Sequence, residues 1–190
     1  MSKAEISDVK ARYSRLIARL YDSSGGSYIE TIGPNDNYTA TFIGIEEPGE
    51  ISADMTSAFV WCWSLKDYLK KELNTRGVSS VEFEQKINEF HALTLCSDVA
   101  NRLKHGSLRK SRSGHFARLE NEGTSFSQNE VESIVRSESG YTFNLKKDAN
   151  IQLTANIVDQ KGDILMDAMQ CLEGSYEAWT KIAANWNVDF

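Results

Sequence analysis

A carboxylate, an amide and an imidazole recur at helical spacing in one short segment of the chain. Asp98, Asn101 and His105 are three and four residues apart, so a helix places them on one face, with Arg102 on its flank. Such a group can orient a histidine tautomer or keep the ring protonated for general acid–base chemistry. A structural alternative stays open, in which Asp98 pairs locally and the cations oppose the negative end of the helix dipole. The candidate catalytic residues are His105, Asn101, Asp98 and Arg102.

A second polar group lies on the preceding helical segment. Trp63 and Asp67 are one turn apart, off the main apolar stripe. If this helix packs antiparallel to the helix of His105, then Asp67 faces the same surface and Trp63 and Asp67 form the second side of the site. The alternative is a solvated Lys–Asp pair on an exposed flank.

A basic stretch follows the same helix. No Asp or Glu occurs between Val99 and Leu119, whereas the chain as a whole has a net charge of −6. Serine, arginine and lysine in a short loop (106–114) are suited to contacts with phosphate groups through guanidinium, hydroxyl and amide donors. The alternative is a solvated connector that offsets the acidic surface. The candidate nucleic-acid-binding residues are Lys104, Arg109, Lys110, Arg112 and His115.

Composition restricts the class of protein. The 190 residues contain no run of about 18 apolar residues, so no membrane-spanning helix is expected. The first eight residues lack an apolar signal core, which favours the cytoplasm. The three cysteines form no C-x-x-C pair and fall on predicted apolar stripes, so we expect buried, reduced thiols. The histidines lack metal-ligand spacing and no phosphate-binding glycine loop occurs, so neither a metal nor a cofactor is expected.

Hydrophobic periodicity predicts the elements that must position these residues. The fold class is α+β: four main helices packed with a small antiparallel β-sheet and an N-terminal β-hairpin, in a single domain over 1–190. The hairpin pairs 28–32 with 38–45 across a Gly-Pro-Asn-Asp-Asn turn. Helices are expected at 2–21, 51–74, 80–105 and 163–186, and the remaining strands at 115–120, 131–135, 141–145 and 151–158.

Two helical segments also resemble a known group of proteins. Cys62–Leu69 reads C-W-S-L-K-D-Y-L, and Cys96–His105 reads C-S-D-V-A-N-R-L-K-H. Both resemble small uncharacterised bacterial and phage proteins with a C-x-H-L-K-D-W-L helix, a C-x-D-x-x-N-x-x-K-H helix, strands and a Trp-containing last helix. Trp179 lies where that tryptophan is expected, and the resemblance covers roughly residues 55–182.

The same motifs are distantly similar to HEPN domains, helical modules of toxin, defence and RNA-processing systems. The resemblance implies metal-independent cleavage of RNA, in which a 2′-hydroxyl attacks the adjacent phosphate, and a site formed across a homodimer. His105 would then be the general acid or base, and Asn101 and Asp98 would orient its ring. Charge on the phosphorane would be stabilised by Arg102 and Lys104, with Arg109 or Arg112 from the loop.

The HEPN signature has an arginine one to two turns before its histidine. Here Asp98 and Asn101 stand at those distances from His105, and Ser64 replaces the histidine of the first motif. We therefore favour a noncatalytic accessory protein of a mobile-element or defence context that binds nucleic acid or an acidic partner. The alternative is a HEPN-like ribonuclease centred on His105. A third hypothesis is a small-ligand pocket lined by Trp61, Trp63 and Tyr68.

Overall fold

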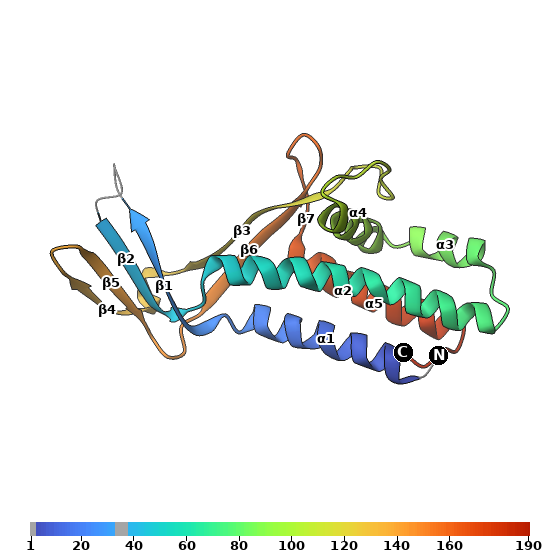
Figure 1. Ribbon diagram of the computed structural model, residues 1–190, viewed down its shortest axis with the longest axis horizontal. Coiled ribbons are helices and arrows are strands. Elements are labelled where there is room, and N and C mark those ends of the chain that lie inside the picture. Colours follow the sequence, from blue (N-terminus) through green and yellow to red (C-terminus); the bar gives the residue numbers. More distant parts are fainter. Residues whose placement is uncertain (1–2, 33–37) are drawn as a thin grey trace. The chain divides into compact units, whose positions relative to one another are not determined.

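The computed structural model describes residues 3–32 and 38–190, which contain five α-helices and seven strands in the order α1, β1–β2, α2–α4, β3–β7 and α5 (Figure 1). The hairpin turn predicted at 33–37 lies outside the described residues. The helices are α1 (Lys3–Tyr21), α2 (Pro48–Thr75), α3 (Ser80–Asn88), α4 (His91–His105) and α5 (Ala168–Asn185). The strands are β1 (Ser24–Ile32), β2 (Tyr38–Ile45), β3 (Arg118–Phe126), β4 (Val131–Arg136), β5 (Gly140–Leu145), β6 (Ile151–Val158) and β7 (Ile164–Asp167).

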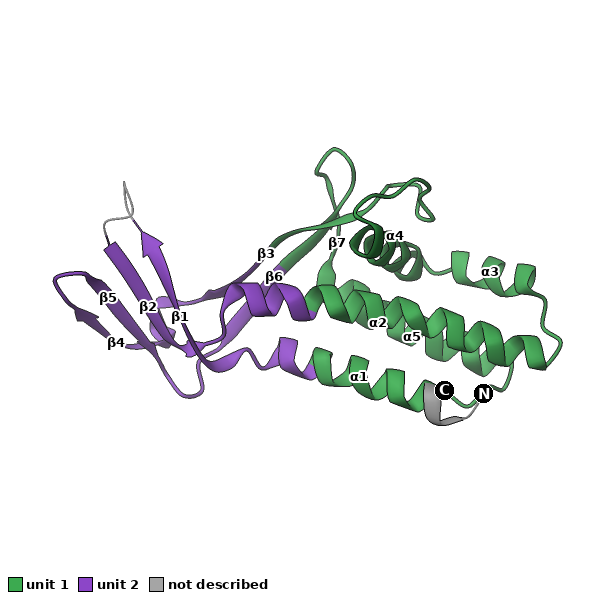
Figure 2. Cartoon of the chain, in the orientation of Figure 1, with its two compact units in different colours: residues 1–17, 55–121, 155–190 green, residues 18–54, 122–154 purple. Residues whose placement is uncertain are grey.

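The chain divides into two compact units, drawn in green and purple in Figure 2. Unit 1 comprises residues 1–17, 55–121 and 155–190, and unit 2 comprises residues 18–54 and 122–154. The backbone therefore passes from one unit to the other four times. The single domain predicted over 1–190 stays a prediction.

Helix α5 is the centre of unit 1. Its Trp179 is fully buried and donates its indole N–H to the carbonyl of Cys62 on α2 at 3.0 Å. Its backbone also accepts a hydrogen bond from the hydroxyl of Tyr13 on α1, at 2.9 Å from the carbonyl oxygen of Leu172. Helices α3 and α4 pack against it as well. A tryptophan suits this position because its large ring fills the core and its one hydrogen-bond donor, the indole N–H, has a partner.

The three cysteines lie in this helical core, as the apolar stripes predicted. Cys62, Cys96 and Cys171 are free thiols with no exposed surface. Burial raises the pKa of the Cys96 and Cys171 thiols well above the ordinary value, because an apolar interior disfavours a thiolate. These cysteines are therefore packing residues.

The structure corrects the helix predicted at 80–105, which is two helices. Helix α3 ends at Asn88, and α4 begins at His91 after Phe90, whose backbone is extended (φ −107°, ψ 107°). At the other end Gly106 terminates α4 as predicted: its φ of 71° is left-handed, and its N–H bonds to the carbonyl of Arg102. With the break, the structure has five helices rather than four.

Unit 2 contains a four-stranded sheet in the order β1-β2-β5-β4. The predicted hairpin strands pair antiparallel with Ile32 opposite Tyr38, although β1 begins at Ser24 rather than at residue 28. The prediction of one small antiparallel sheet is wrong in two respects. Strand β2 pairs with β5 in parallel, and β3, β6 and β7 form a second sheet. The helix predicted from 163 accordingly begins at Ala168, because Ile164–Asp167 pair with β6 instead.

Aromatic rings and one glycine hold β2 against β5. The ring of Phe42 stacks on Tyr28 of β1 and on Phe143 of β5, with centroids 4.8 and 5.1 Å apart. Gly140 begins β5 where a Cβ atom would lie 1.9 Å from the carbonyl oxygen of Thr39. No other residue fits this close approach of two backbones, which explains a glycine at the start of the strand.

We expect Gly140→Ala to separate β5 from β2, because the added carbon overlaps a backbone oxygen that cannot move independently. The free energy of unfolding should fall by about 2–3 kcal/mol, and amide exchange should accelerate in β2 and β5. Urea unfolding and hydrogen exchange measure both. Gly49→Ala is the matched control: the nearest atom to its added carbon is 3.8 Å away, and alanine favours the helix. Equal stability of the two variants would contradict the close approach.

Candidate functional site

A polar cleft of about 640 Å³ opens in unit 1, and residues from α2, α3, α4 and the following loop line it. Four of its side chains are lysine or arginine and two are acidic, so the cleft is net positive in a chain of net charge −6. It contains most of the residues that the sequence singled out. The lining residues are Trp63, Lys66, Asp67, Glu84, Asn88, Ser97, Asn101, Lys104, His105, Lys110 and Arg112.

Helix α2 supplies one wall. Trp63, Lys66 and Asp67 are three and four residues apart, so they share one face, and all three line the cleft. Trp63 is only 6% exposed and the ammonium of Lys66 lies 5.2 Å from its ring centre, whereas Asp67 is exposed. Asp67 and Trp63 therefore line the same cleft as His105.

Helix α4 supplies the facing wall through Ser97, Asn101, Lys104 and His105, which lie about one turn apart. The amide of Asn101 donates to the hydroxyl of Ser97 at 3.4 Å, and the Lys104 ammonium reaches the hydroxyl of Ser64 on α2 at 3.4 Å. Lys104 and His105 are exposed. The last turn of α4 therefore presents an amide, a cation and an imidazole to solvent inside one cleft.

Asp98 lies on the same helix but does not line the cleft. Its carboxylate is 1% exposed and accepts hydrogen bonds from the loop. Ser111 donates through its hydroxyl, Ser113 donates through its hydroxyl at 2.6 Å, and the backbone N–H of Arg112 donates at 2.7 Å. These three donors replace the hydrogen bonds to water that the buried carboxylate oxygens have lost. Asp98 thus fastens residues 111–113 to α4 rather than contacting the imidazole of His105.

That fastening directs the Arg112 side chain into the cleft. Its guanidinium donates to Glu84 at 2.6 Å and to the side-chain oxygen of Asn88 at 2.8 Å, both on α3. The same guanidinium lies 5.3 Å from the ring centre of Trp63, within the range of a cation–π contact. Glu84 also accepts from Lys66 at 2.7 Å. One loop residue consequently links α3 and α2, while its backbone is held by α4.

The pKa of Glu84 reflects this pairing. Partial burial raises the pKa of the carboxyl, but hydrogen bonds and positive charge from Lys66 and Arg112 outweigh burial and lower it overall. The folded state therefore favours the carboxylate, and this contribution to stability is present above the unfolded-state pKa, about 4.3. It is lost as the pH falls through the lower folded-state pKa, so the Lys66–Glu84–Arg112 link holds at neutral pH.

Besides Asp98, three further predicted site residues lie outside the cleft. Arg102 donates from Nη2 to the carbonyl of Phe116 at 3.1 Å, and its buried Nε has no hydrogen-bond partner. Arg109 is exposed and does not line the cleft. His115 lies edge-on to His91, with ring centres 6.3 Å apart. Arg102, like Asp98, is thus directed to the chain segment after α4, so neither side chain is placed to act on a group bound in the cleft.

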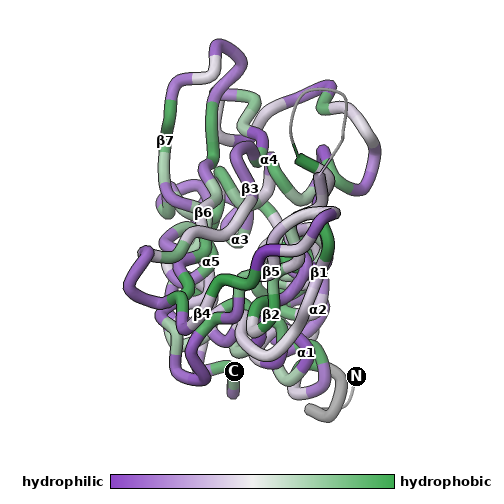
Figure 3. The backbone as a smooth tube through the Cα atoms, turned by 90° about the vertical axis from the view of Figure 1, so that its left-hand side faces the viewer, coloured by the Kyte–Doolittle hydropathy of each residue, from purple (hydrophilic) through white to green (hydrophobic). Residues whose placement is uncertain are grey.

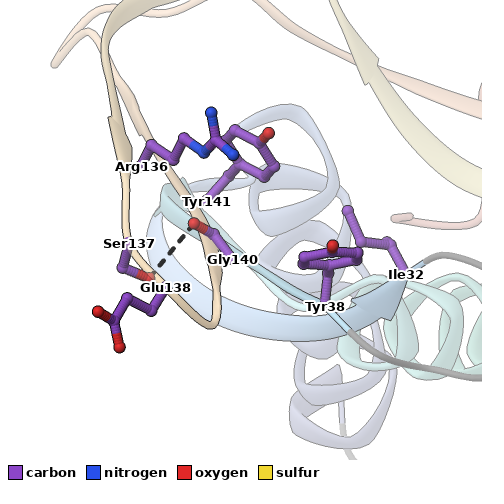
Figure 4. A pocket seen from close by; sticks show the side chains of 7 residues that line it. All are labelled: Ile32, Tyr38, Arg136, Ser137, Glu138, Gly140 and Tyr141. Carbon is purple, nitrogen blue, oxygen red and sulfur yellow. Dashed lines mark hydrogen bonds between the residues drawn. The ribbon is translucent and has the colours of Figure 1, made fainter.

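Trp61 and Tyr68 do not line the cleft either, so of the three residues of the small-ligand hypothesis only Trp63 lies in it. The guanidinium of Arg12 lies 5.0 Å from the ring centre of Trp61. A larger hollow of about 790 Å³ does open in unit 2, at the end of the four-stranded sheet (Figure 4). Tyr38, Tyr141 and Arg136 line it, and none of the predicted site residues does.

Sequence reasoning missed Lys66, Glu84, Asn88 and Ser97. Lys66 could have been predicted from the sequence, because it lies between Trp63 and Asp67 in the first helix motif. Glu84 and Asn88 had no local signal, because they enter the site only through the break between α3 and α4. Among the described residues, no cluster of His, Cys, Asp or Glu could hold a metal ion. No described helix has the length and apolar character that crossing a membrane requires.

We expect Asp98→Asn to release the loop from α4. The substitution removes the charge and turns an acceptor into a donor that opposes the N–H and hydroxyl donors around it. The free energy of unfolding should fall by about 2–3 kcal/mol, and the amides of 111–113 should exchange faster. Asp67→Asn, the same isosteric change at an exposed acid that lines the cleft, should stay within about 0.5 kcal/mol of the unsubstituted chain. Equal losses in the two variants would refute the anchoring role of Asp98.

The cleft is built from the two helix motifs that suggested a family resemblance, one on α2 and one on α4. Their cysteines are buried, and Lys66 and Asp67 of the first motif line the same cleft as Asn101, Lys104 and His105 of the second. That resemblance stays a prediction. No family model, curated protein or solved structure matches this chain.

Proposed function

We propose that this chain is a noncatalytic nucleic-acid-binding protein, and that the cleft between α2, α3 and α4 holds the phosphate backbone of RNA or DNA. The observation that carries the proposal is the gathering of Lys66, Lys104, Lys110 and Arg112 around one cleft in an otherwise acidic chain. Cations that surround a concave surface neutralise phosphates and release counterions, which provides affinity without sequence readout.

The cations divide into two pairs with different roles. Lys66 and Arg112 are paired with Glu84, so they frame the cleft and contribute little net charge. Lys104 and Lys110 take part in none of the ion pairs found among the described residues, and both are exposed. Binding should therefore depend mainly on Lys104 and Lys110, with the Asn101 amide and the His105 ring as further donors to phosphate oxygens.

Trp63 argues for binding that is independent of base identity. It is the aromatic residue that lines the cleft, but it is 6% exposed, and Lys66 and Arg112 already lie close to its ring. A base therefore finds no open aromatic face on Trp63, and stacking on such faces supplies much of the affinity of single-strand binders. The cleft is suited to phosphate contacts instead.

Binding of labelled single-stranded oligonucleotides across a salt series tests the proposal. The logarithm of affinity should fall linearly with the logarithm of salt concentration, and Lys104→Gln and Lys110→Gln should each reduce that slope by about 1. Each variant should also weaken binding at low salt by roughly fivefold, because one charged contact is lost. Lys181→Gln is the matched control: it removes an exposed lysine on α5 that pairs only with Glu177.

Two outcomes would reject the proposal. One is the absence of salt-sensitive binding, and the other is an equal loss in the Lys181 and Lys104 variants. A polyglutamate peptide with the same number of negative charges as the oligonucleotide serves as competitor. Displacement of the oligonucleotide by this peptide would indicate an acidic protein partner, the other binding function that the sequence suggests.

A HEPN-like ribonuclease is the second candidate function, and the position of His105 favours it. Its imidazole lines the cleft with Asn101, Lys104 and Lys110, which is where a scissile phosphate would be bound. In such a reaction His105 moves the proton of the 2′-hydroxyl or of the leaving oxygen, and the lysines stabilise the phosphorane. Asp98 and Arg102 take no part, since their contacts go to the loop and to Phe116.

His105→Ala separates the two functions. Under the binding proposal, RNA stays intact with the unsubstituted chain in the presence of EDTA, and the variant keeps its affinity within about twofold, because only one hydrogen-bond donor is lost. Cleavage of RNA but not DNA by the unsubstituted chain would establish the ribonuclease, provided that His105→Ala abolishes it and leaves binding in place. An Asn101→Ala variant serves as the control for a substitution on the same wall.

A further inference from the structure

Strand β4 is an exposed edge of the four-stranded sheet. It pairs with β5 on one side, and no described strand pairs with it on the other. Its residues from Glu132 to Arg136 are all exposed, including two aliphatic side chains, Ile134 at 54% and Val135 at 56%. Figure 3 shows a green hydrophobic segment in this strand. Two consecutive exposed β-branched residues on an open edge are what proteins normally avoid or use for pairing.

The direction of the backbone groups along this edge follows from the hairpin. The N–H of Ser137 donates to the carbonyl of Gly140 at 2.8 Å, so residue 137 directs its backbone groups toward β5 (Figure 4 shows the accompanying side-chain bond). In an antiparallel ladder these directions alternate. The backbone N–H and C=O groups of Val135 therefore also point toward β5, and those of Ile134 and Arg136 point to the open side.

We propose that β4 pairs antiparallel with β4 of a second copy of this chain, with Ile134 opposite the partner's Ile134. This register brings Glu132, at the end of the regular stretch, close to the partner's Arg136, and the twofold axis generates the same pair again. Opposite charges directly across an antiparallel pair stabilise it, and like charges destabilise it. The two Ile134 residues then exchange backbone hydrogen bonds, and the two sheets become one continuous sheet of eight strands.

The charge pattern selects this partner and this register. In-register parallel pairing would bring Glu132 against Glu132 and Arg136 against Arg136, and a shift by one residue removes both opposite-charge pairs. The other edge strand, β1, has one acidic residue and no basic one, so it has no such complement. A bulge at Glu132, between Val131 and Ser133, interrupts the ladder with β5, so the regular stretch of β4 runs from Ser133 to Arg136 and Glu132 lies at its end.

The proposal involves unit 2 alone and uses no residue of the cationic cleft. It is therefore independent of the proposed function and of the HEPN-like homodimer, whose site would include His105. Around the twofold axis, Ile134 lies beside Phe143 of its own sheet, so pairing buries aliphatic and aromatic surface that the single chain leaves exposed.

Charge reversal tests the register. With Glu132→Arg alone, each pair between residues 132 and 136 contains two arginines. With Arg136→Glu alone, each such pair contains two glutamates. Each variant should raise the dimer dissociation constant at least about tenfold in sedimentation equilibrium. An equimolar mixture of the two variants should dimerise again, since every pair is then of opposite charge, and the double variant should dimerise by itself. Lys147→Glu, the same charge change at an exposed position outside β4, should leave the constant unchanged.

A backbone variant gives an independent measurement. Ile134→Pro removes an N–H that points to the open side, so β4 keeps its ladder with β5 while self-pairing is lost. Circular dichroism should remain that of the unsubstituted chain while the dimer disappears. The proposal is overturned if the unsubstituted chain is monomeric up to near-millimolar concentration, if Ile134→Pro still dimerises, or if the mixed variants stay monomeric.

Discussion

The arrangement around the cleft depends on one buried charge. Among the described residues, Asp98 is the only charged side chain that the fold buries. An isolated carboxylate in an apolar interior would cost several kcal/mol, so the chain has to bring donors to it. It does so with a short Ser-Arg-Ser segment, whose two hydroxyls and one N–H meet both carboxylate oxygens. The loop is therefore part of the helical unit, and the position of Arg112 follows from it.

The break between α3 and α4 is the second determinant of the cleft. A continuous helix over 80–105 would be straight, and Glu84 would lie several turns from His105. Because the backbone is extended at Phe90, α3 changes direction and Glu84 reaches Lys66 on α2 and Arg112 from the loop. Helical periodicity thus places the residues of α2 and α4 that line the cleft. The break at Phe90 places those of α3.

This difference explains how far the sequence could predict the site. Trp63, Asp67, Asn101 and His105 were predicted together, because each pair lies on one helix face and the two helices share apolar stripes. The role of Asp98 was not predictable, because helix spacing places it beside Asn101 while its partners come from a loop with no periodicity. The α3–α4 break contains no glycine or proline, and the apolar pattern on both sides of Phe90 is that of one helix. For the sheet, alternation predicted each strand, but the parallel pairing of β2 with β5 joins segments that local patterns cannot relate.

That pairing affects the order of events during synthesis. Thr39 meets Ser139, 100 residues further along the chain, so β2 leaves the ribosome well before the strand that completes its sheet. At roughly 5–20 residues per second, the hairpin waits about 5–20 s with the ring of Phe42 uncovered on one side. The helical unit waits longer, because Trp179 is supplied by the last helix. Neither unit can therefore close before a segment far from its first strand or helix has been synthesised: β5 in unit 2, and α5 in unit 1.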